Sequence, residues 1–519
     1  MKNRIRELLL DICSVKSVSG TSGESEMGRR IHSILAKLSC FSGERSGNLK
    51  TIDCDGRPAV LAFIEASGGS SVTLGLTGHF DVVSASVYGE LADTAFDPER
   101  LTADIAMREL PESVRKDLDE GWLFGRGTAD MKCGLAVHMA LMERWDREGA
   151  PCNVLFLAVP DEENLSLGMR KAVPEVARFL EERGLSVSAW VNGEPTVGAK
   201  GSSWPVHRGS IGKAMGFVLS VGVGSHVGEF FKGISAVQIA GQINSHLEGG
   251  PESADRLGDL IFPPAACLGL EALRDGYSVT LYDRVMARYN LLYCSRSPEE
   301  LLKVLLSSAR EGLARAIDLT SWSARKLGVS LSLPESQVMT LSELRRVAGE
   351  ADPVGENVSG SPVDIAAAEV LSLLDKSGLE GPMAVVGFLP PLYPPTMEVD
   401  DEAEGRLDRA LEAVFDLARE RGYEPVKEPI FEGISDLSYL GRVVGNGDMS
   451  VLKENMAGWG DLYDVPFEAM KAVQAPVCNL GPFGKDVHKA TERLEPRFAF
   501  SVLPDLVERL AVELARSRA

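Results

Sequence analysis

The chain is poor in cysteine and in positive charge. Its eight cysteines are scattered, without a Cys-x-x-Cys pair or the density of a disulfide-stabilised scaffold, and this favours a reduced protein. Lysine and arginine number 54 against 75 aspartates and glutamates, which gives a formal net charge of −21. Binding to nucleic-acid backbones or to anionic membranes needs clustered basic residues, so we expect neither kind of partner.

Long apolar runs are also missing. No stretch stays apolar for the ~20 residues that a bilayer-spanning helix needs. The first residues, Met1 to Cys13, mix charges into their apolar positions instead of forming the apolar region of a signal peptide. No internal repeat, heptad run or low-complexity tract is present. We therefore expect a cytoplasmic globular protein whose partners are small molecules.

Strand-like and helix-like patterns alternate along the first part of the chain. Apolar runs at 59–64, 72–77 and 153–159 predict strands, and apolar residues at helical spacing predict helices at 132–145 and 170–183. This alternation is typical of an α/β sheet. With 519 residues, of which 44% are hydrophobic, the chain can form about two to four domains at ~150 residues each.

A different pattern interrupts this alternation. Between 208 and 325 we predict strands at 212–221, 278–281 and 287–294 and helices at 233–247 and 298–319, the order of a compact inserted domain. The α/β pattern then resumes, with strands at 382–389 and 477–480 and helices at 402–421 and 504–516. The first domain is therefore expected to be discontinuous.

A histidine and an aspartate follow the second predicted strand. His79 comes directly after a glycine and Asp81 lies two residues further, so in an extended chain both side chains project to the same side. A carboxylate there can hold one imidazole nitrogen while the other binds a metal. A histidine after a strand is more often structural, and for this pair taken alone that alternative stays open.

Three acids stand at turns. Asp130 lies among glycines at the entrance to a helix, where an N-capping role is the alternative. Glu162 and Glu163 come directly after the strand 153–159. Two adjacent acids repel each other unless a cation or a proton intervenes, and a surface acidic turn is the alternative.

Two further candidates occupy the same kind of position. Glu194 follows a predicted strand at 187–191, and His488 lies in a glycine-bearing loop after the strand 477–480. Ligands of open α/β sheets gather at the carboxyl ends of the strands. Five such placements in a chain with only seven histidines favour a metal centre over a series of unrelated turns.

Together these residues supply two histidines, three carboxylate ligand candidates and Glu162 as a further acid. The set suits two divalent ions that share a bridging carboxylate and a bridging water. Zn²⁺ takes nitrogen and oxygen ligands of this kind. Co²⁺ and Mn²⁺ accept the same ligands, so the sequence does not distinguish among the three ions.

The order of the motifs resembles a known family. Gly-His-x-Asp-Val-Val, Gly-Arg-Gly-x-x-Asp-Met-Lys, Asp-Glu-Glu, Gly-Glu-Pro-Thr and a late histidine succeed one another as in the two-zinc metallohydrolases that include acetylornithine deacetylase, succinyl-diaminopimelate desuccinylase and glutamate carboxypeptidase. The resemblance covers nearly the whole chain. Further segments, such as Arg208-Gly-Ser-Ile-Gly-Lys213 and Gly484-Lys-Asp-Val-His488, are similar to the branch of the arginine-utilisation protein RocB.

The resemblance implies a co-catalytic two-metal hydrolase that cleaves an amide or peptide bond of an N-acyl amino acid or small peptide. One ion would be held by His79, Asp130 and Glu194. The other would be held by Asp130, Glu163 and His488, with Asp130 bridging the two.

Other roles follow from the same resemblance. Asp81 would orient His79, and Glu162 would take a proton from the bridging water and pass it to the leaving amine. A non-proline cis peptide would follow Asp130. His226 matches the lid histidine that, in relatives, reaches the partner subunit's active site and stabilises the oxyanion, which implies a homodimer through the lid domain.

The implied fold is a discontinuous zinc-hydrolase catalytic domain at 1–207 and 326–519, with a mixed central sheet flanked by helices. Residues 208–325 would form the inserted α+β lid and dimerisation domain. Residues 330–375, the least regular stretch, are a candidate further insertion.

Substrate recognition departs from the family pattern. The Asp-x-Arg often found in the lid has no clean counterpart here. Arg288 or Arg296, from the same region, could hold a substrate carboxylate bidentately, with surface salt bridging as the alternative for both. Two other functions stay open: an aminopeptidase or a carbamoyl or acyl amide hydrolase, and a non-catalytic metal-binding or regulatory relative that keeps the fold.

Overall fold

The computed structural model describes residues 1–519 except 197–202, 275, 277, 350–359, 444–448 and 518–519. The chain divides into two compact units. Unit 1 comprises Met1–Ser210, Thr396–Val443 and Pro466–Ala519, and unit 2 comprises Ile211–Pro395 and Val444–Val465. Among the described helices, none combines the length and the apolar character needed to cross a bilayer.

Unit 1 is built on a mixed sheet. Its eight strands lie in the order β1 (Leu49–Ile52), β2 (Ala59–Ile64), β5 (Asn153–Val159), β3 (Thr73–His79), β6 (Ala189–Asn192), β16 (Val477–Asn479), β7 (Ser203–His207) and β15 (Glu424–Glu428). The central strands β5, β3, β6 and β16 run parallel, while β1, β2 and β7 introduce antiparallel pairs. Both β5 and β3 are buried along their whole length, which explains the continuous apolar run of β5 from Val154 to Val159.

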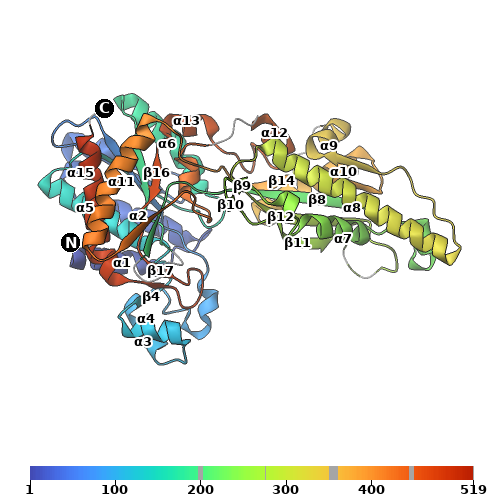
Figure 1. The fold of residues 1–519 in the computed structure, drawn as a ribbon, viewed down its shortest axis with the longest axis horizontal. Coiled ribbons are helices and arrows are strands. Elements are labelled where there is room, and N and C mark those ends of the chain that lie inside the picture. The colour runs from blue at the N-terminus through green and yellow to red at the C-terminus, as the bar shows by residue number, and fades with distance from the viewer. Residues whose placement is uncertain (197–202, 275, 277, 350–359, 444–448, 518–519) are drawn as a thin grey trace. The chain divides into compact units, whose positions relative to one another are not determined.

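Helices cover both faces of this sheet. On one face lie α1 (Lys2–Cys13), α5 (Lys132–Glu148), α11 (Glu402–Glu420) and α15 (Leu503–Arg516), of which the last three are seen side by side in Figure 1. Alternate β2 residues such as Ala62 and Ile64 join the core with these helices. Between them, Phe63 contacts Phe179 of α6 (Leu167–Arg183) on the other face. The α/β fold with a mixed central sheet flanked by helices is confirmed.

A small three-stranded sheet joins distant parts of unit 1. It contains β17 (Gly484–Lys485), β18 (Arg493–Leu494) and β4 (Leu123–Phe124), all antiparallel. Nearby lie α3 (Pro98–Ala106), α4 (Glu112–Asp119) and α14 (Pro496–Ser501). The pairing of β18 with β4 holds the loop that bears His488 next to the segment that leads to Asp130.

Unit 2 has its own sheet, in the order β11 (Ala266–Ala272), β12 (Arg284–Tyr293), β8 (Gly212–Val221), β14 (Met383–Tyr393) and β13 (Gln337–Thr340). The helices α7 (Ala236–Leu247) and α8 (Pro298–Leu327) pack against each other and against this sheet. The unit also contains α9 (Leu341–Ala348), α10 (Pro362–Ser377) and α12 (Met449–Asn455).

The boundary of unit 2 differs from the one we expected. We expect residues 326–519 to complete the catalytic domain, but β14 pairs with β8 and carries β13 on its other edge, so residues 326–395 fall in unit 2, together with Val444–Val465. All eleven residues of β14 are buried. A fully buried strand fits the centre of the unit 1 sheet or of the unit 2 sheet, so the apolar sequence of β14 does not indicate to which sheet it belongs. In the candidate insertion at 330–375, residues 350–359 lie outside the described residues.

One predicted strand of unit 2 is wrong. Residues 278–281 form only an isolated bridge, between Thr280 and His226, and the strand that pairs with β12 is β11 instead. Five of the seven β11 residues are exposed, and its register with β12 shifts between Cys267 and Gly269, so its apolar pattern is weak.

Candidate metal centre

The candidate ligands lie at the carboxyl ends of adjacent parallel strands. His79 is the last residue of β3, where it pairs with Val159 at the end of β5. Glu162 and Glu163 follow β5, and Glu194 follows β6, which pairs with the other edge of β3. The sheet therefore brings together residues that lie more than 100 positions apart in the sequence, as the open-sheet rule predicts.

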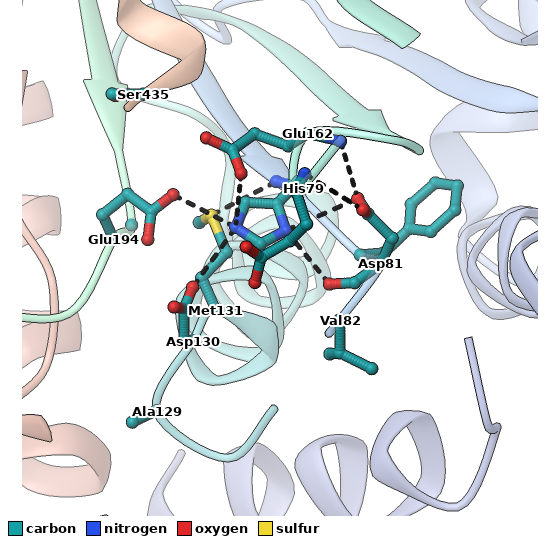
Figure 2. A network of polar contacts seen from close by, with 12 residues as sticks. His79, Asp81, Val82, Ala129, Asp130, Met131, Glu162, Glu194 and Ser435 are labelled. Carbon is teal, nitrogen blue, oxygen red and sulfur yellow. Dashed lines mark hydrogen bonds and ion pairs between the residues drawn. The ribbon is translucent and has the colours of Figure 1, made fainter. Parts of the chain in front are cut away.

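The imidazole of His79 faces carboxylates on both sides, as Figure 2 shows. Its Nε2 lies 3.3 Å from Asp130 Oδ1, 3.2 Å from Glu194 Oε1 and 3.8 Å from Glu162 Oε2. Its Nδ1 is hydrogen-bonded to the main-chain oxygen of Asp81 at 3.1 Å, and an Asp81 carboxylate oxygen lies 3.6 Å away. The main-chain carbonyl of Asp81 thus makes the shorter contact that orients the ring, and the Asp81 carboxylate makes a slightly longer one.

Asp130 stands between the two histidines. Its Oδ1 faces His79, and its Oδ2 lies 3.2 Å from Nε2 of His488. The same Nε2 lies 2.9 Å from Glu163 Oε1. A cis peptide bond joins Asp130 to Met131, as the resemblance implied. Each oxygen of one carboxylate therefore points to a different imidazole.

A tight turn after β5 directs the side chains of Glu162 and Glu163 to different places. Adjacent residues of an extended chain point in opposite directions, but Asp161 has a φ of 67°, and the residues after it form a turn. The Asp81 carboxylate accepts hydrogen bonds from the main-chain nitrogens of Glu162 at 3.0 Å and Glu163 at 3.2 Å. As a result the two glutamates reach different histidines.

The turn is also held by Asp161. Its carboxylate accepts hydrogen bonds from the nitrogen of Leu167 at 3.0 Å and from the Arg57 guanidinium at 2.7 Å. Arg57 also bonds the buried Glu24 at 3.1 Å. The start of α6 and the turn are thus joined to α2 (Ser22–Leu35), which carries Glu24.

Glycines permit a close approach of the chain around Glu194. A Cβ on Gly481 would lie 1.6 Å from the main-chain oxygen of Glu194. A Cβ on Gly134, in the first turn of α5, would lie 2.3 Å from the oxygen of Gly193. Any side chain at these positions would push apart the elements that carry Asp130, Glu194 and His488.

The acids and the imidazoles perturb one another strongly. Burial raises the pKa of Glu194 to about 8, with the Asp130 charge adding to it, and burial also raises the pKa values of Glu162 and Glu163. Hydrogen bonds to Asp130 and Glu163 raise the pKa of His488 to about 10. A negatively charged carboxylate raises the pKa of a neighbouring acid or imidazole, because it favours the form of that group that carries the extra proton.

This donor set fits divalent metal ions. Oxygen and nitrogen atoms of His79, Asp130 and Glu163 lie within 4.8 Å of one another, as do those of His79, Glu162 and Glu194. Imidazole and carboxylate are the ligands that zinc, cobalt and manganese accept. A cation in the cluster would offset the repulsion among its carboxylates.

Glu492 supports the site and was missed as a functional residue. It is fully buried and lies in the loop after His488. Its Oε1 accepts hydrogen bonds from the main-chain nitrogens of Ala129 at 3.3 Å and Asp130 at 3.4 Å, and its Oε2 pairs with the buried Arg126. Arg126, in the Gly-Arg-Gly segment before Asp130, is therefore paired with a buried acid. An arginine in this segment was the sequence feature that could have indicated such a partner.

Asp436 is a second buried acid that the sequence did not single out. It lies in the short helix η6 (Asp436–Tyr439), and its two carboxylate oxygens have no hydrogen-bond partner among the described groups. Burial raises its pKa to about 7, and its charge in turn raises the pKa values of Glu162 and Glu194. It therefore adds negative potential to the site without touching a positive group.

The remaining candidates lie in unit 2. His226 is exposed, and its Nδ1 accepts a hydrogen bond from Gly228 at 3.1 Å. Arg288 pairs with Asp364 at 3.1 Å and Glu271 at 3.4 Å. Arg296 donates to the main-chain oxygen of Ala254 at 2.7 Å. Both arginines are thus engaged by their own unit, in line with the salt-bridging alternative for Arg288.

Comparison with known families gives a match over most of the chain. The profile of peptidase family M20/M25/M40 matches residues 75–455. Among curated proteins, protein YqjN of Bacillus subtilis (strain 168) is 30% identical over 98% of this chain and 95% of its own length. Protein RocB of the same organism is 27% identical over 99% and 95%. Succinyl-diaminopimelate desuccinylase 2 of Ruegeria sp. (strain TM1040) is 25% identical over 43% and 48%.

Solved structures share the fold at low sequence identity. An M20 family metallo-carboxypeptidase, Sso-CP2 from Sulfolobus solfataricus, has a TM-score of 0.57 at 12% identity and covers 98% of this chain and 99% of its own. The dipeptidase Dug1p from Saccharomyces cerevisiae has a TM-score of 0.56 at 12% identity, over 100% and 97%.

Proposed function

Because the chain belongs to peptidase family M20/M25/M40, we propose that it uses two metal ions to cleave an amide or peptide bond of an N-acyl amino acid or a small peptide. Membership of the family makes the chain a metal-dependent hydrolase. The number of ions, their ligands, the proton-transfer residue and the substrate are what we propose.

The position of Asp130 carries the proposal. Its two carboxylate oxygens lie 3.3 Å and 3.2 Å from the Nε2 atoms of His79 and His488. A carboxylate that only capped a helix would not need two imidazoles, one on each oxygen. A carboxylate that bridges two ions does need a ligand beside each oxygen.

The neighbours of each histidine complete two ligand sets. Glu194 lies beside His79 at 3.2 Å, and Glu163 lies beside His488 at 2.9 Å. We assign His79, Asp130 and Glu194 to one ion and Asp130, Glu163 and His488 to the other. Divalent ions held there would polarise the scissile carbonyl and make water more acidic.

Glu162 is the acid left over, and we assign proton transfer to it. Its Oε2 lies 3.8 Å from His79 Nε2, so it faces the cluster. Burial raises its pKa well above the usual range for a glutamate. A carboxylate with a raised pKa accepts a proton more readily near neutral pH and returns it to a leaving amine. The other residues hold ligands in place: Asp81 fixes His79 and the turn, and Glu492 fixes the chain at Asp130.

The substrate class rests on the relatives. A desuccinylase removes an acyl group from an amine, and the fold neighbours include a dipeptidase and a carboxypeptidase. Each reaction hydrolyses an amide near a carboxylate-bearing group.

We further propose that the protein is a cytoplasmic homodimer, that unit 2 is the lid, and that His226 serves the partner subunit's site by stabilising the oxyanion.

Hydrolysis of a substrate panel tests the function. The purified protein, supplied with Zn²⁺, Co²⁺ or Mn²⁺, is incubated with N-acetyl and N-succinyl amino acids, dipeptides and tripeptides, and released amine is measured. We expect turnover of at least one class with at least one metal. Absence of turnover across the whole panel, in protein that binds metal, would argue for the non-catalytic alternative.

A further inference from the structure

A cavity lies within unit 1. Its volume is about 730 Å³, and its lining comes from four stretches: the end of α4 with Trp122, residues 421–423, residues 483–485, and residues 495–497. Pockets for small molecules have volumes of ~300 to 1,000 Å³. None of the proposed metal ligands lines this cavity, and nothing in the proposed hydrolysis uses it.

Aromatic rings form part of the wall. Tyr423 and Phe483 are stacked, with ring centroids 5.7 Å apart and an angle of 28° between the planes. Trp122 is buried, and the Nζ of Lys485 lies 4.4 Å from its ring centroid. Phe483 and Trp122 are buried, so the apolar area that this wall offers to a flat group comes mainly from the partly exposed Tyr423.

The charge of the lining opposes that of the whole protein. Lys116, Arg421, Lys485 and Arg497 line the cavity against three acids, in a chain with a net charge of −21. Arg421 is engaged by Asp505 at 2.6 Å, so an excess of positive charge that attracts anions comes only from a lining cation that has no acid of its own.

Two of the three acids are already engaged. Asp117 accepts hydrogen bonds from Lys485 at 2.8 and 2.9 Å and from the buried Arg493 at 2.7 Å, so it serves two cations. Glu495 accepts hydrogen bonds from the main-chain nitrogens of Arg497 and Phe498 at the start of α14. The third acid, Glu120, is exposed and lies 3.8 Å from Lys116.

Arg497 is the cation without a counterpart. Within the described part of the chain, its guanidinium has no hydrogen-bond or ion-pair partner, and its side chain is exposed at the cavity. Arginine presents a planar group of donors that matches carboxylate or phosphate oxygens two at a time. An anion placed there would meet Arg497 while its body lies against the rings.

We infer that this cavity binds a small organic anion, in which a carboxylate or a phosphate is joined to a flat apolar body. Arg497 and Lys485 hold the charged group, and Tyr423 and Phe483 contact the body. A bare inorganic anion lacks the second contact, and a neutral ring compound lacks the first, so each half alone binds more weakly than the whole.

Calorimetric titration of the full-length, metal-loaded protein tests this site. The probes are phenylacetate for the carboxylate source, with acetate and benzyl alcohol as its halves, and adenosine 5′-monophosphate for the phosphate source, with inorganic phosphate and adenosine as its halves. We expect one of the two anions to bind, at least about tenfold more tightly than its corresponding half, since the loss of one good contact weakens binding by about that factor. The probe that binds identifies the anion.

Variants assign the binding to the cavity. Arg497→Gln removes a side chain that has no partner among the described residues, so it should keep the melting temperature and the hydrolytic activity while weakening binding of the anion about tenfold or more. Lys485→Met should act in the same direction. Arg516→Gln, an exposed arginine of α15 with 65% of its side chain accessible, is the matched control and should bind as the wild type does.

Three results would overturn the proposal. They are the absence of binding by both anions at concentrations on the order of 10 mM, well above the millimolar affinities of weak ligands, equal binding of the bound anion by wild type and Arg497→Gln, and equal binding of that anion and either of its own halves. The readout is binding, so its failure does not depend on whether the protein hydrolyses an amide.

Discussion

The Asp81 carboxylate accepts a hydrogen bond from the main-chain nitrogen of Glu162 at 3.0 Å. This bond links the end of β3, which carries His79, to the turn that carries the proposed proton acceptor. A second bond, from the nitrogen of Glu163 at 3.2 Å, extends the link to a proposed ligand. One buried carboxylate thus sets the relative positions of a histidine and two acids, which explains the spacing of His79 and Asp81.

The first prediction concerns the proton acceptor. Glu162→Gln keeps the size of the side chain and removes its ability to accept a proton, so kcat should fall by about 10²- to 10⁴-fold, the usual contribution of a general base. Metal content, measured by mass spectrometry, should stay at the wild-type value because Glu162 is not among the proposed ligands. Unchanged turnover in this variant would reject the assigned role.

A second prediction concerns Asp81. In Asp81→Asn one acceptor oxygen becomes an amide donor that faces a main-chain nitrogen or Ser19, whose hydroxyl now donates to Asp81 at 2.7 Å. Zinc affinity, measured by competition with a chromophoric chelator, should fall by about 10- to 100-fold. Ser19→Ala keeps both main-chain hydrogen bonds to Asp81, so its zinc affinity should fall less than that of Asp81→Asn. Equal affinities for Asp81→Asn and the wild type would contradict the supporting role.

The sequence pointed to the candidate metal ligands but not to the buried acids Glu492 and Asp436 near them, for a physical reason. Ligand candidates stand directly after apolar runs, and a strand end is visible in the local pattern, as for His79 and Glu194. Glu492 and Asp436 act through burial and through contacts with groups hundreds of positions away, such as Arg126. No local pattern records such contacts.

The missed strands follow the same logic. Three of the five β15 residues are exposed, and β7 alternates between half-buried and buried positions. β15 is the edge strand of the unit 1 sheet and β7 is its neighbour, so β15 has one flank and both strands have part of each face that need no apolar residue. The segment near Trp204 consequently read as a domain boundary, although it is the penultimate strand.

A third prediction concerns the buried pair of Arg126 and Glu492. Their side chains are 1% and 0% exposed. Glu492→Gln leaves the guanidinium buried without a carboxylate and should cost about 3 to 5 kcal/mol of unfolding free energy, measured by urea denaturation. Glu424→Gln is the control, since Glu424 is 65% exposed and 3.7 Å from Arg419, and it should change stability by less than about 1 kcal/mol. Equal effects of the two substitutions would contradict the account.

A fourth prediction concerns pH and His138. This histidine is buried in α5, and burial lowers its pKa from 6.5 to about 3. Between these values the unfolded chain binds a proton that the folded protein excludes, so stability falls as the pH drops from about 6.5 towards 3. The slope for this one group approaches about 1.4 kcal/mol per pH unit.

The comparison with His138→Met isolates that group. All other titrations are common to both proteins, so the difference in their unfolding free energies, measured by urea denaturation at several pH values, reports His138 alone. The variant should gain stability relative to the wild type as the pH falls below about 6.5. A difference that does not change with pH would contradict the prediction.

Metal titration of activity tests the central claim most directly. Protein stripped of metal and freed of chelator is titrated with Zn²⁺, and bound zinc and hydrolysis of the best substrate are measured on the same samples. A bridging Asp130 between His79 and His488 predicts binding of two ions per chain and activity that rises until both are bound. Binding of one ion per chain or fewer, or no hydrolysis at any zinc level with Co²⁺ and Mn²⁺ also inactive, would contradict the claim.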